Sequence, residues 1–269
     1  MPTIEKHAPG SFCWVELATS DQAAAKDFYA KLFGWEPNDM PMGPDAVYTM
    51  FKLNGRDAGA ACTLQPDEVK MGIPPHWNLY VSVEDADAAT HRAVLLGGKA
   101  LAAAFDVFSV GRMAVLQDPT GAVFQVWQPK MHHGVGIWNE PGTFCWADLS
   151  TGDRRRAQQF YQDMFGWTMD LGKDKSDPNG YLHIANGKQY IAGILPDSYR
   201  DPNTPPHWMP YFVVPSADEA TDKVKELGGQ AYMNPTNVDE KLRIAIVADP
   251  QGAVFALFQA GGAAAENHG

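Results

Sequence analysis

The chain repeats itself once along its length. FCWVEL at residues 12–17 returns as FCWADL at residues 144–149, and in both copies an FY pair and then FGW follow at the same spacing. The first strings lie 132 residues apart, and PPHW at residues 74–77 recurs 131 residues later, at residues 205–208. A spacing that changes by only one residue indicates a duplicated domain rather than a recurring short motif.

The repeat defines the domain boundaries. We expect one domain at residues 10–128 and a second at residues 142–260. The segment between them, residues 129–141, contains the glycine and proline that are typical of a linker.

Composition excludes several classes of function. The chain has 269 residues, 45% of them hydrophobic, with a net charge of -11 and a pI near 5.1. Such an acidic chain is a poor partner for nucleic acids or for anionic membranes, which need clustered lysine and arginine. The three cysteines are too few for a disulfide framework, and the first ten residues contain no apolar signal sequence. We therefore expect a cytoplasmic protein that binds no nucleic acid or membrane, and that is a monomer or a homodimer.

Each copy divides again into two modules. FCWVELAT has the residues of a strand, and the following SDQAAAKDFYAKLFGW has a helix N-cap, an apolar stripe and a terminal glycine. Two strands joined by Asn-Gly come next, a strong hairpin signal. The segment from HWNLYVSV to the hairpin with the turn DPTG repeats the order of strand, helix and strands. The sequence thus predicts an α+β fold.

The chain resembles the vicinal oxygen chelate superfamily, which contains glyoxalase I, bleomycin-resistance proteins and extradiol dioxygenases. The resemblance rests on the apolar first strand followed by FYAKLFGW or FYQDMFGW, and on the late hairpins DPTGAVFQVW and DPQGAVFALF. It implies two tandem domains, each of two βαβββ modules that form a cupped sheet with the helices outside. It also implies metal ligands of the His, Gln or Glu type on the first and last strands of each module.

Strand alternation predicts which side chains enter each cup, because successive residues of a strand point to opposite faces. On the first strand, Cys13, Val15 and Leu17 should pack on the helix, which leaves Phe12 and Trp14 for the cup. The same reasoning gives the candidate residues of the first cup, which are Trp14, Glu16, His76, Asn78, Tyr80, Gln125 and Trp127. Their counterparts in the second copy are Trp146, Asp148, His207, Met209, Tyr211, Ala256 and Phe258.

Most positions of the family's metal ligands hold residues of other types in this chain. The slots on the first strands contain Trp14 and Trp146, those on the second-module first strands contain Asn78 and Met209, and those on the last strands contain Gln125 and Ala256. An indole nitrogen has no lone pair to give, and a catalytic metal generally needs three His, carboxylate or thiolate ligands. We therefore expect no metal site and no cofactor.

A carboxylate and an imidazole recur together on the predicted inward faces. Glu16 with His76, and Asp148 with His207, could act as general acid and base without a metal if they come within hydrogen-bond reach. The alternative is that the histidines bind backbone groups of the PPHW turn. Arg112 and its repeat Arg243 could pair with these acids or hold an anionic ligand.

Three functions stay open from the sequence. The first is binding of a small planar or apolar molecule in an aromatic-lined cup, by Trp14, Asn78, Tyr80, Gln125 and Trp127, with Glu16 and His76 as the acid and base if chemistry occurs. The second is a divalent-metal-dependent lyase or dioxygenase of the glyoxalase type. The third is a non-catalytic scaffold whose cups are filled by their own side chains. We expect the first cup to be the working one, and the linker histidines His132 and His133 to be exposed.

Overall fold

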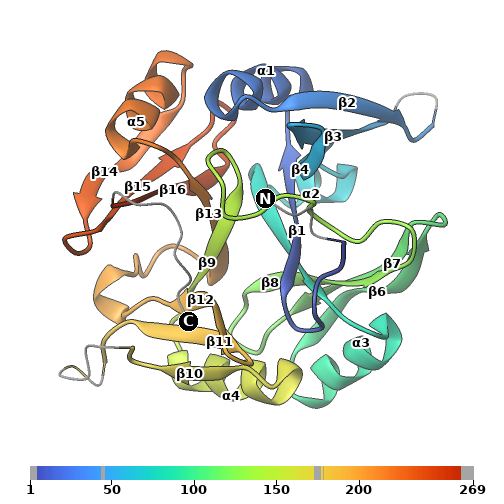
Figure 1. Ribbon diagram of the computed structural model, residues 1–269. Helices are drawn as coiled ribbons and strands as arrows, with labels where there is room; N and C mark the ends of the chain where they lie inside the picture. The colour runs from blue at the N-terminus through green and yellow to red at the C-terminus, as the bar shows by residue number, and fades with distance from the viewer. Residues whose placement is uncertain (1–4, 44–45, 173–176, 178, 262–269) are drawn as a thin grey trace.

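The computed structural model describes residues 5–43, 46–172, 177 and 179–261, and it contains two eight-stranded sheets of mixed direction, one per copy (Figure 1). The first sheet has the order β2 (Glu36–Pro41), β3 (Val47–Leu53), β4 (Arg56–Thr63), β1 (Phe12–Thr19), β5 (His76–Ser82), β8 (Val123–Pro129), β7 (Gly111–Gln117) and β6 (Lys99–Val107). The second has the order β10 (Thr168–Asp170), β11 (Leu182–Asn186), β12 (Gln189–Ile194), β9 (Phe144–Ser150), β13 (His207–Val213), β16 (Val254–Ala260), β15 (Leu242–Ala248) and β14 (Gln230–Asn237).

Each sheet is built from two βαβββ modules, as the sequence predicts. The first strands of the two modules, β1 and β5, pair antiparallel at the centre, and each pairs in parallel with the last strand of its own module. The longer helices are α1 (Gln22–Phe33), α3 (Ala86–Leu95), α4 (Arg154–Phe165) and α5 (Ala217–Glu226). The short elements are α2 (Pro66–Lys70) and the 3₁₀ turn η1 (Asp197–Tyr199).

The ends of α1 follow from its sequence. The Asp21 carboxylate accepts a hydrogen bond from the Ala24 amide, which caps the start of the helix. Gly34 ends the helix in the left-handed conformation at φ 75°, where a side chain would be strained. Phe28, Tyr29 and Phe33 form the buried stripe between these caps.

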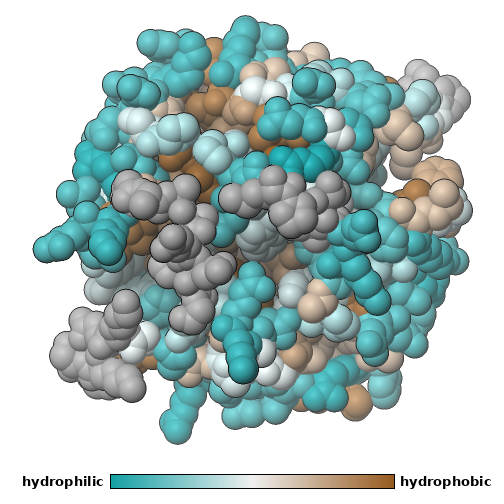
Figure 2. Space-filling model, in the orientation of Figure 1, coloured by the Kyte–Doolittle hydropathy of each residue, from teal (hydrophilic) through white to brown (hydrophobic). Residues whose placement is uncertain are grey.

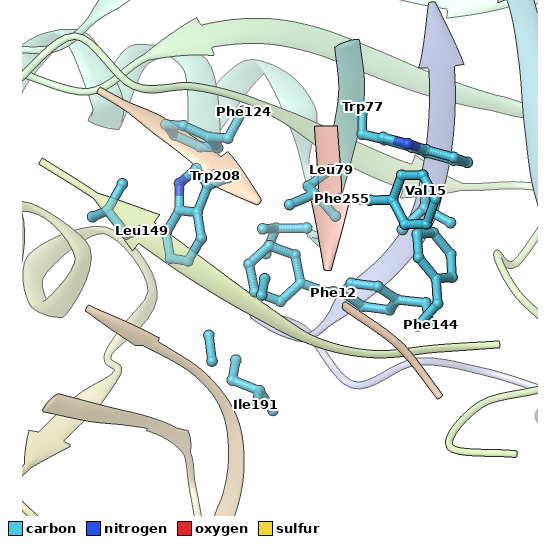
Figure 3. Close-up of a cluster of buried hydrophobic side chains, with 14 of the residues drawn as sticks. Phe12, Val15, Trp77, Leu79, Phe124, Phe144, Leu149, Ile191, Trp208 and Phe255 are labelled. Atoms are coloured by element: carbon cyan, nitrogen blue, oxygen red, sulfur yellow. The ribbon is translucent and has the colours of Figure 1, made fainter. Parts of the chain in front are cut away.

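The convex faces of the two sheets share one hydrophobic core. Residues of both copies belong to this core, and Figure 3 shows Phe12 and Trp77 of the first copy among Phe144, Trp208 and Phe255 of the second. Figure 1 places α1 beside α5 and α3 beside α4, so each pair of neighbouring helices combines both copies. The helices lie outside the cups, and those of one copy also pack against the other.

Two buried hydrogen bonds connect the copies symmetrically. The Tyr29 hydroxyl donates to Asp249 Oδ2 at 3.0 Å, and the Tyr161 hydroxyl donates to Asp118 Oδ2 at 3.0 Å. Trp35 and Trp167 add a second pair, since their indole nitrogens donate to backbone carbonyls of the opposite copy. The repeated FY and FGW strings are therefore a part of the contact between the domains.

The alternation predicted for the first strand is wrong at its beginning. The register between β1 and β5 shifts between Phe12 and Trp14, which is the sign of a β-bulge. Phe12 consequently turns into the convex core, while Cys13 joins Trp14 on the concave side. The second copy has the same shift opposite Tyr211 and Phe212, and Cys145 lies on its concave side.

None of the helices in the described part of the chain is long and apolar enough to cross a membrane.

We expect the double substitution of Tyr29 and Tyr161 by phenylalanine to destabilise the protein. Each change leaves a buried aspartate oxygen without its donor, which typically costs about 1 to 3 kcal/mol. Urea unfolding measures the free energy, and Tyr232→Phe, at an exposed tyrosine, is the control. Equal stability of the double variant and the control would show that these bonds do not hold the domains together.

Candidate functional site

The three central strands of the first sheet bring the predicted cup residues together. Glu16 on β1 lies opposite Asn78 on β5, and Trp14 lies opposite Tyr80. Tyr80 is in turn level with Gln125 on β8. The polar groups predicted for the first cup therefore form a continuous set across β1, β5 and β8.

Two tyrosines hold the Glu16 carboxyl. The Tyr48 hydroxyl donates to Oε2 at 2.7 Å, and the Tyr80 hydroxyl donates to Oε1 at 3.0 Å. Trp14 Nε1 donates to the Tyr48 hydroxyl at 3.0 Å, so it orients that phenol. Burial raises the pKa of Glu16, and the hydrogen bonds from the two tyrosines oppose this rise. A carboxyl tuned in this direction exchanges its proton closer to neutral pH than an exposed one does.

Gln125 is incompletely bonded beside this carboxyl. Its Nε2 donates to Asn78 Oδ1 at 2.7 Å, but its buried Oε1 has no partner among the residues described. If the oxygen and nitrogen of this amide were assigned the other way round, the nitrogen would lack a partner instead of the oxygen. The first cup thus contains an amide able to bind one further group.

The linker covers the first cup, contrary to the expected exposure of His132. The Val135 amide donates to the Cys13 carbonyl at 2.8 Å, and Val135 packs in the apolar cluster of this cup. The His132 ring contacts Trp14 at a centroid distance of 4.5 Å and Trp127 at 5.9 Å. Burial lowers the pKa of His132, and its buried Nε2 has no partner within the described ranges. His133 is exposed, as expected.

His76 and His207 bind the turns that precede their strands. His76 Nδ1 lies 2.9 Å from the Pro74 carbonyl, and His207 Nδ1 lies 2.8 Å from the Pro205 carbonyl. In the part of the chain that is described, no hydrogen bond joins Glu16 to His76 or Asp148 to His207. The arginines pair elsewhere, because Arg112 binds Asp87 and Arg243 binds Asp218.

In the second cup, three side chains donate hydrogen bonds directly to the Asp148 carboxyl. Asp148 accepts hydrogen bonds from Tyr181 at 2.5 Å, from Tyr211 at 2.6 Å and from Trp146 Nε1 at 3.0 Å. It is only 3% exposed, and burial raises its pKa, while the bond from Tyr181 opposes the rise most strongly. Gly193 makes room for this arrangement, because a Cβ there would lie 1.9 Å from the Tyr181 hydroxyl.

Both cups therefore contain a carboxyl, two phenols and an indole. Sequence reasoning found the carboxyls, the indoles and one phenol of each set. It missed Tyr48 on β3 and Tyr181 directly before β11, which bind the carboxyls of their cups in the same way. The available signal was the tyrosine that follows Val47 in one copy and Gly180 in the other, at the start of the first strand of the hairpin.

The donor set of neither cup fits a catalytic metal. The described residues contain no group of three or more His, Cys, Asp or Glu side chains placed to hold an ion. Glu16 and Asp148 are surrounded by O–H and N–H donors, whereas a metal-binding carboxylate needs further lone pairs converging beside it. Met209 and Ala256 are apolar members of the second cup.

Two surface hollows lie outside the cups. One, of about 420 Å³, is lined by residues of α1 and β2, including Lys26 and Asp39. The other, of about 380 Å³, lies between the copies and includes Thr120, Arg156 and Arg200.

A family model described as Glyoxalase/Bleomycin resistance protein/Dioxygenase superfamily matches residues 11–126 and again residues 143–257. The chain belongs to this superfamily. The two matches agree with the two sheets, so the chain is a tandem member of the superfamily with two domains of the same fold.

Relatives of this superfamily member cover nearly the whole chain. The protein named "Putative glyoxylase CFP32" of Mycobacterium tuberculosis (strain CDC 1551 / Oshkosh) is 37% identical over 96% of this chain and 98% of its own. Anthracycline biosynthesis protein DnrV of Streptomyces peucetius is 32% identical over 95% of each chain.

Solved structures of low identity share the fold of this superfamily member. The Mn(II)-bound glyoxalase of Novosphingobium aromaticivorans has a TM-score of 0.63 and 17% identity, over 93% of this chain and 82% of that one. The 2,3-dioxygenase LapB of Pseudomonas sp. KL28 has a TM-score of 0.64 and 13% identity, over 96% of this chain and 95% of that one.

We expect Asp148 to make the stability of the protein depend on pH. Its pKa is raised above the ordinary value of 3.8, so the folded protein binds this proton more strongly than the unfolded chain. The contribution of Asp148 to the free energy of unfolding is therefore greatest at low pH, and it decreases as the pH rises through the raised pKa.

Urea unfolding between about pH 4 and pH 8 tests this sign. Asp148→Asn, which cannot ionise, should show a smaller decrease with rising pH than the wild type. Glu84→Gln, at an exposed carboxyl, should leave the profile unchanged. A steeper decrease in Asp148→Asn would contradict the assignment.

Proposed function

We propose that this superfamily member binds a flat or apolar small organic molecule in its first cup, with the Glu16 carboxyl as the polar contact at the base. The observation that carries the proposal is the pair of buried polar atoms, Gln125 Oε1 and His132 Nε2, that lack partners among the described residues. An unpaired buried polar atom costs about 1 to 3 kcal/mol, so a ligand that completes both is favoured.

The lining of the cup supports an aromatic or apolar ligand. Trp14, Tyr80 and Trp127 are among the buried members of its cluster, and Met50 and Met113 pack beside them. Aromatic faces with a few directed polar groups are the usual lining of small-molecule sites. The relative DnrV is named for anthracycline biosynthesis, and anthracyclines are flat polycyclic compounds.

Glu16 is the candidate general acid and base if the bound molecule also reacts. Its raised pKa favours proton exchange near neutral pH, and Tyr48 and Tyr80 would stabilise the carboxylate after it has given up its proton. His76 would exchange a proton with Glu16 only through an intervening ligand or water, because no hydrogen bond joins the two side chains among the described residues and His76 Nδ1 lies against the Pro74 carbonyl. The chemistry proposed for this cup needs no metal.

The second cup is proposed as structural support. All of the donors around Asp148 are already paired with it, and Met209 and Ala256 stand where the first cup has Asn78 and Gln125.

Ligand titration with a dihydroxyanthraquinone tests the site. Glu16→Gln and Gln125→Met should each weaken binding about tenfold, which corresponds to one lost hydrogen bond in a dry site. Asp148→Asn is the matched control in the second cup, and it should bind like the wild type. A loss of affinity confined to Asp148→Asn would place the function in the other copy.

We also expect metal removal to leave binding unchanged. The protein should hold no stoichiometric Zn, Ni, Mn or Fe after dialysis against a chelator, because no three His, Cys, Asp or Glu side chains of the described residues are placed together to hold an ion. Elemental analysis and a repeat of the anthraquinone titration measure this. A metal that binds and increases the affinity for the anthraquinone would contradict the conclusion that the side chains of the cups do not fit a metal.

A further inference from the structure

Two exposed apolar side chains stand on the concave face at opposite edges of the first sheet. Met40 on β2 pairs directly with Tyr48 on β3. Phe105 on β6 pairs with Met113 on β7, which pairs with Trp127 on β8. Directly paired residues of antiparallel strands point to the same face, so both edge residues share the face of the cup. Met40 is 47% exposed and Phe105 is 44% exposed.

A third apolar residue, Phe108, projects from the turn between β6 and β7. It is 69% exposed, and its φ of 46° lies in the left-handed region, where a bulky side chain is strained. Its neighbours Val107 and Val110 pack against the apolar cluster of the first cup. The Val110 carbonyl also accepts a hydrogen bond from the His132 amide of the linker at 3.0 Å. An exposed aromatic ring is thus held in a strained turn at the rim of this cup.

The second copy has polar residues at the places equivalent to Phe105 and Phe108. Thr236 replaces Phe105, because it pairs with Ile244, which pairs with Phe258. Asp239 stands 131 residues after Phe108, at the corresponding turn. The apolar rim therefore occurs on the cup that has unpaired polar atoms and is missing at these two positions of the other cup.

Figure 2 shows tan, apolar surface at the right-hand edge of the molecule, over the ends of the β2–β3 and β6–β7 hairpins that Figure 1 places there.

We propose that Met40, Phe105 and Phe108 form an apolar collar that binds the hydrophobic body of the ligand whose polar end reaches Glu16. The collar rests on the proposed function, and it deepens that function by naming the residues that select for ligand size. Met40 is joined to the carboxyl through Tyr48, which donates to Glu16.

The distance across the sheet defines the class of ligand. Three strand spacings of about 4.8 Å separate β1 from β2, and four separate β1 from β6, so Met40 lies roughly 14 Å and Phe105 roughly 19 Å from Glu16 along the curved sheet. A single ring at Glu16 would leave the collar unused. A molecule of several fused rings would extend over it, and the collar therefore selects for polycyclic ligands.

Two probes separate the collar from the polar base of the cup. The first is an anilinonaphthalene sulfonate dye, whose emission rises on apolar surfaces. The second is the dihydroxyanthraquinone used to test the proposed function. The variants are Met40→Ser with Phe105→Ser, and Phe108→Gly, and the control is Leu95→Ser at a 72% exposed leucine on α3.

We expect the collar variants to lose dye emission and to weaken anthraquinone binding about tenfold, while binding of a single-ring phenol stays unchanged. Phe108→Gly should at the same time raise the thermal midpoint, because glycine accepts the positive φ without strain. Opposite effects on stability and on binding identify a residue kept for its ligand rather than for the fold.

Other outcomes would overturn the collar. Unchanged anthraquinone affinity in the collar variants, with binding lost in Glu16→Gln, would refute the collar and leave the proposed function standing. A dimer that sedimentation shows to dissociate in Met40→Ser with Phe105→Ser, at unchanged ligand affinity, would make a second copy of this chain the occupant. Dye emission that depends on the collar without any anthraquinone binding would refute the proposed function, and with it the ligand assigned to the collar.

Discussion

The structure depends on covering the convex faces of two sheets with one shared core. Residues of both copies belong to this core, and the second βαβββ modules contribute to it only short, alanine-rich or charged helices. The aromatic residues of α1 and α4 therefore pack between the sheets, where Phe33 contacts Phe212 and Phe255 of the other copy. The hydroxyls of Tyr29 and Tyr161, which apolar neighbours would leave unpaired, reach the buried aspartates of the opposite turns. This contact fixes both concave faces on the outer sides of the core.

Both cups place a carboxyl beside two tyrosines and a tryptophan. They differ in whether the surrounding buried polar atoms all have hydrogen-bond partners. Asp148 has a short side chain, and Tyr181, Tyr211 and Trp146 all donate to it directly, so its polar groups are bonded to one another. Glu16 accepts from Tyr48 and Tyr80, while Trp14 reaches Tyr48 instead of the carboxyl. Gln125 donates to Asn78, and its Oε1 remains without a partner among the described residues of the first cup. In the second cup the hydrogen-bond donors around the carboxyl are therefore paired with it, whereas the first cup keeps a buried polar atom that could bind a further group.

Much of the fold could be predicted from the sequence, because the repeat and the alternation of apolar residues depend on local chemistry. The β5 faces followed the alternation, with Trp77 and Leu79 in the convex core and Tyr80 in the cup. The bulge at Phe12 and Cys13 broke the alternation, and nothing local marks it, since both residues are apolar and both are buried.

The missing parts of the candidate site depend on contacts that are distant in sequence. Tyr48 meets Glu16 only because β3 and β4 fold back beside β1, and a single tyrosine in a hairpin does not indicate its partner. His132 lies in a segment with the composition of a linker, whose exposure is the ordinary expectation. Its burial follows from the hydrogen bond between Val135 and Cys13, which no pattern in either segment predicts.

The path of the linker has a consequence for how a duplicated protein diverges. Gly134 runs so close to β1 that a Cβ would lie 2.2 Å from the Cys13 carbonyl, so the connecting chain is itself a wall of the first cup. A chain that joins tandem copies has to leave one and reach the other, and here it does so across the concave face of the first sheet. The covalent connection therefore makes the two copies inequivalent before any substitution occurs. Selection acting on the linker alone can reshape one cup and leave the other as it was.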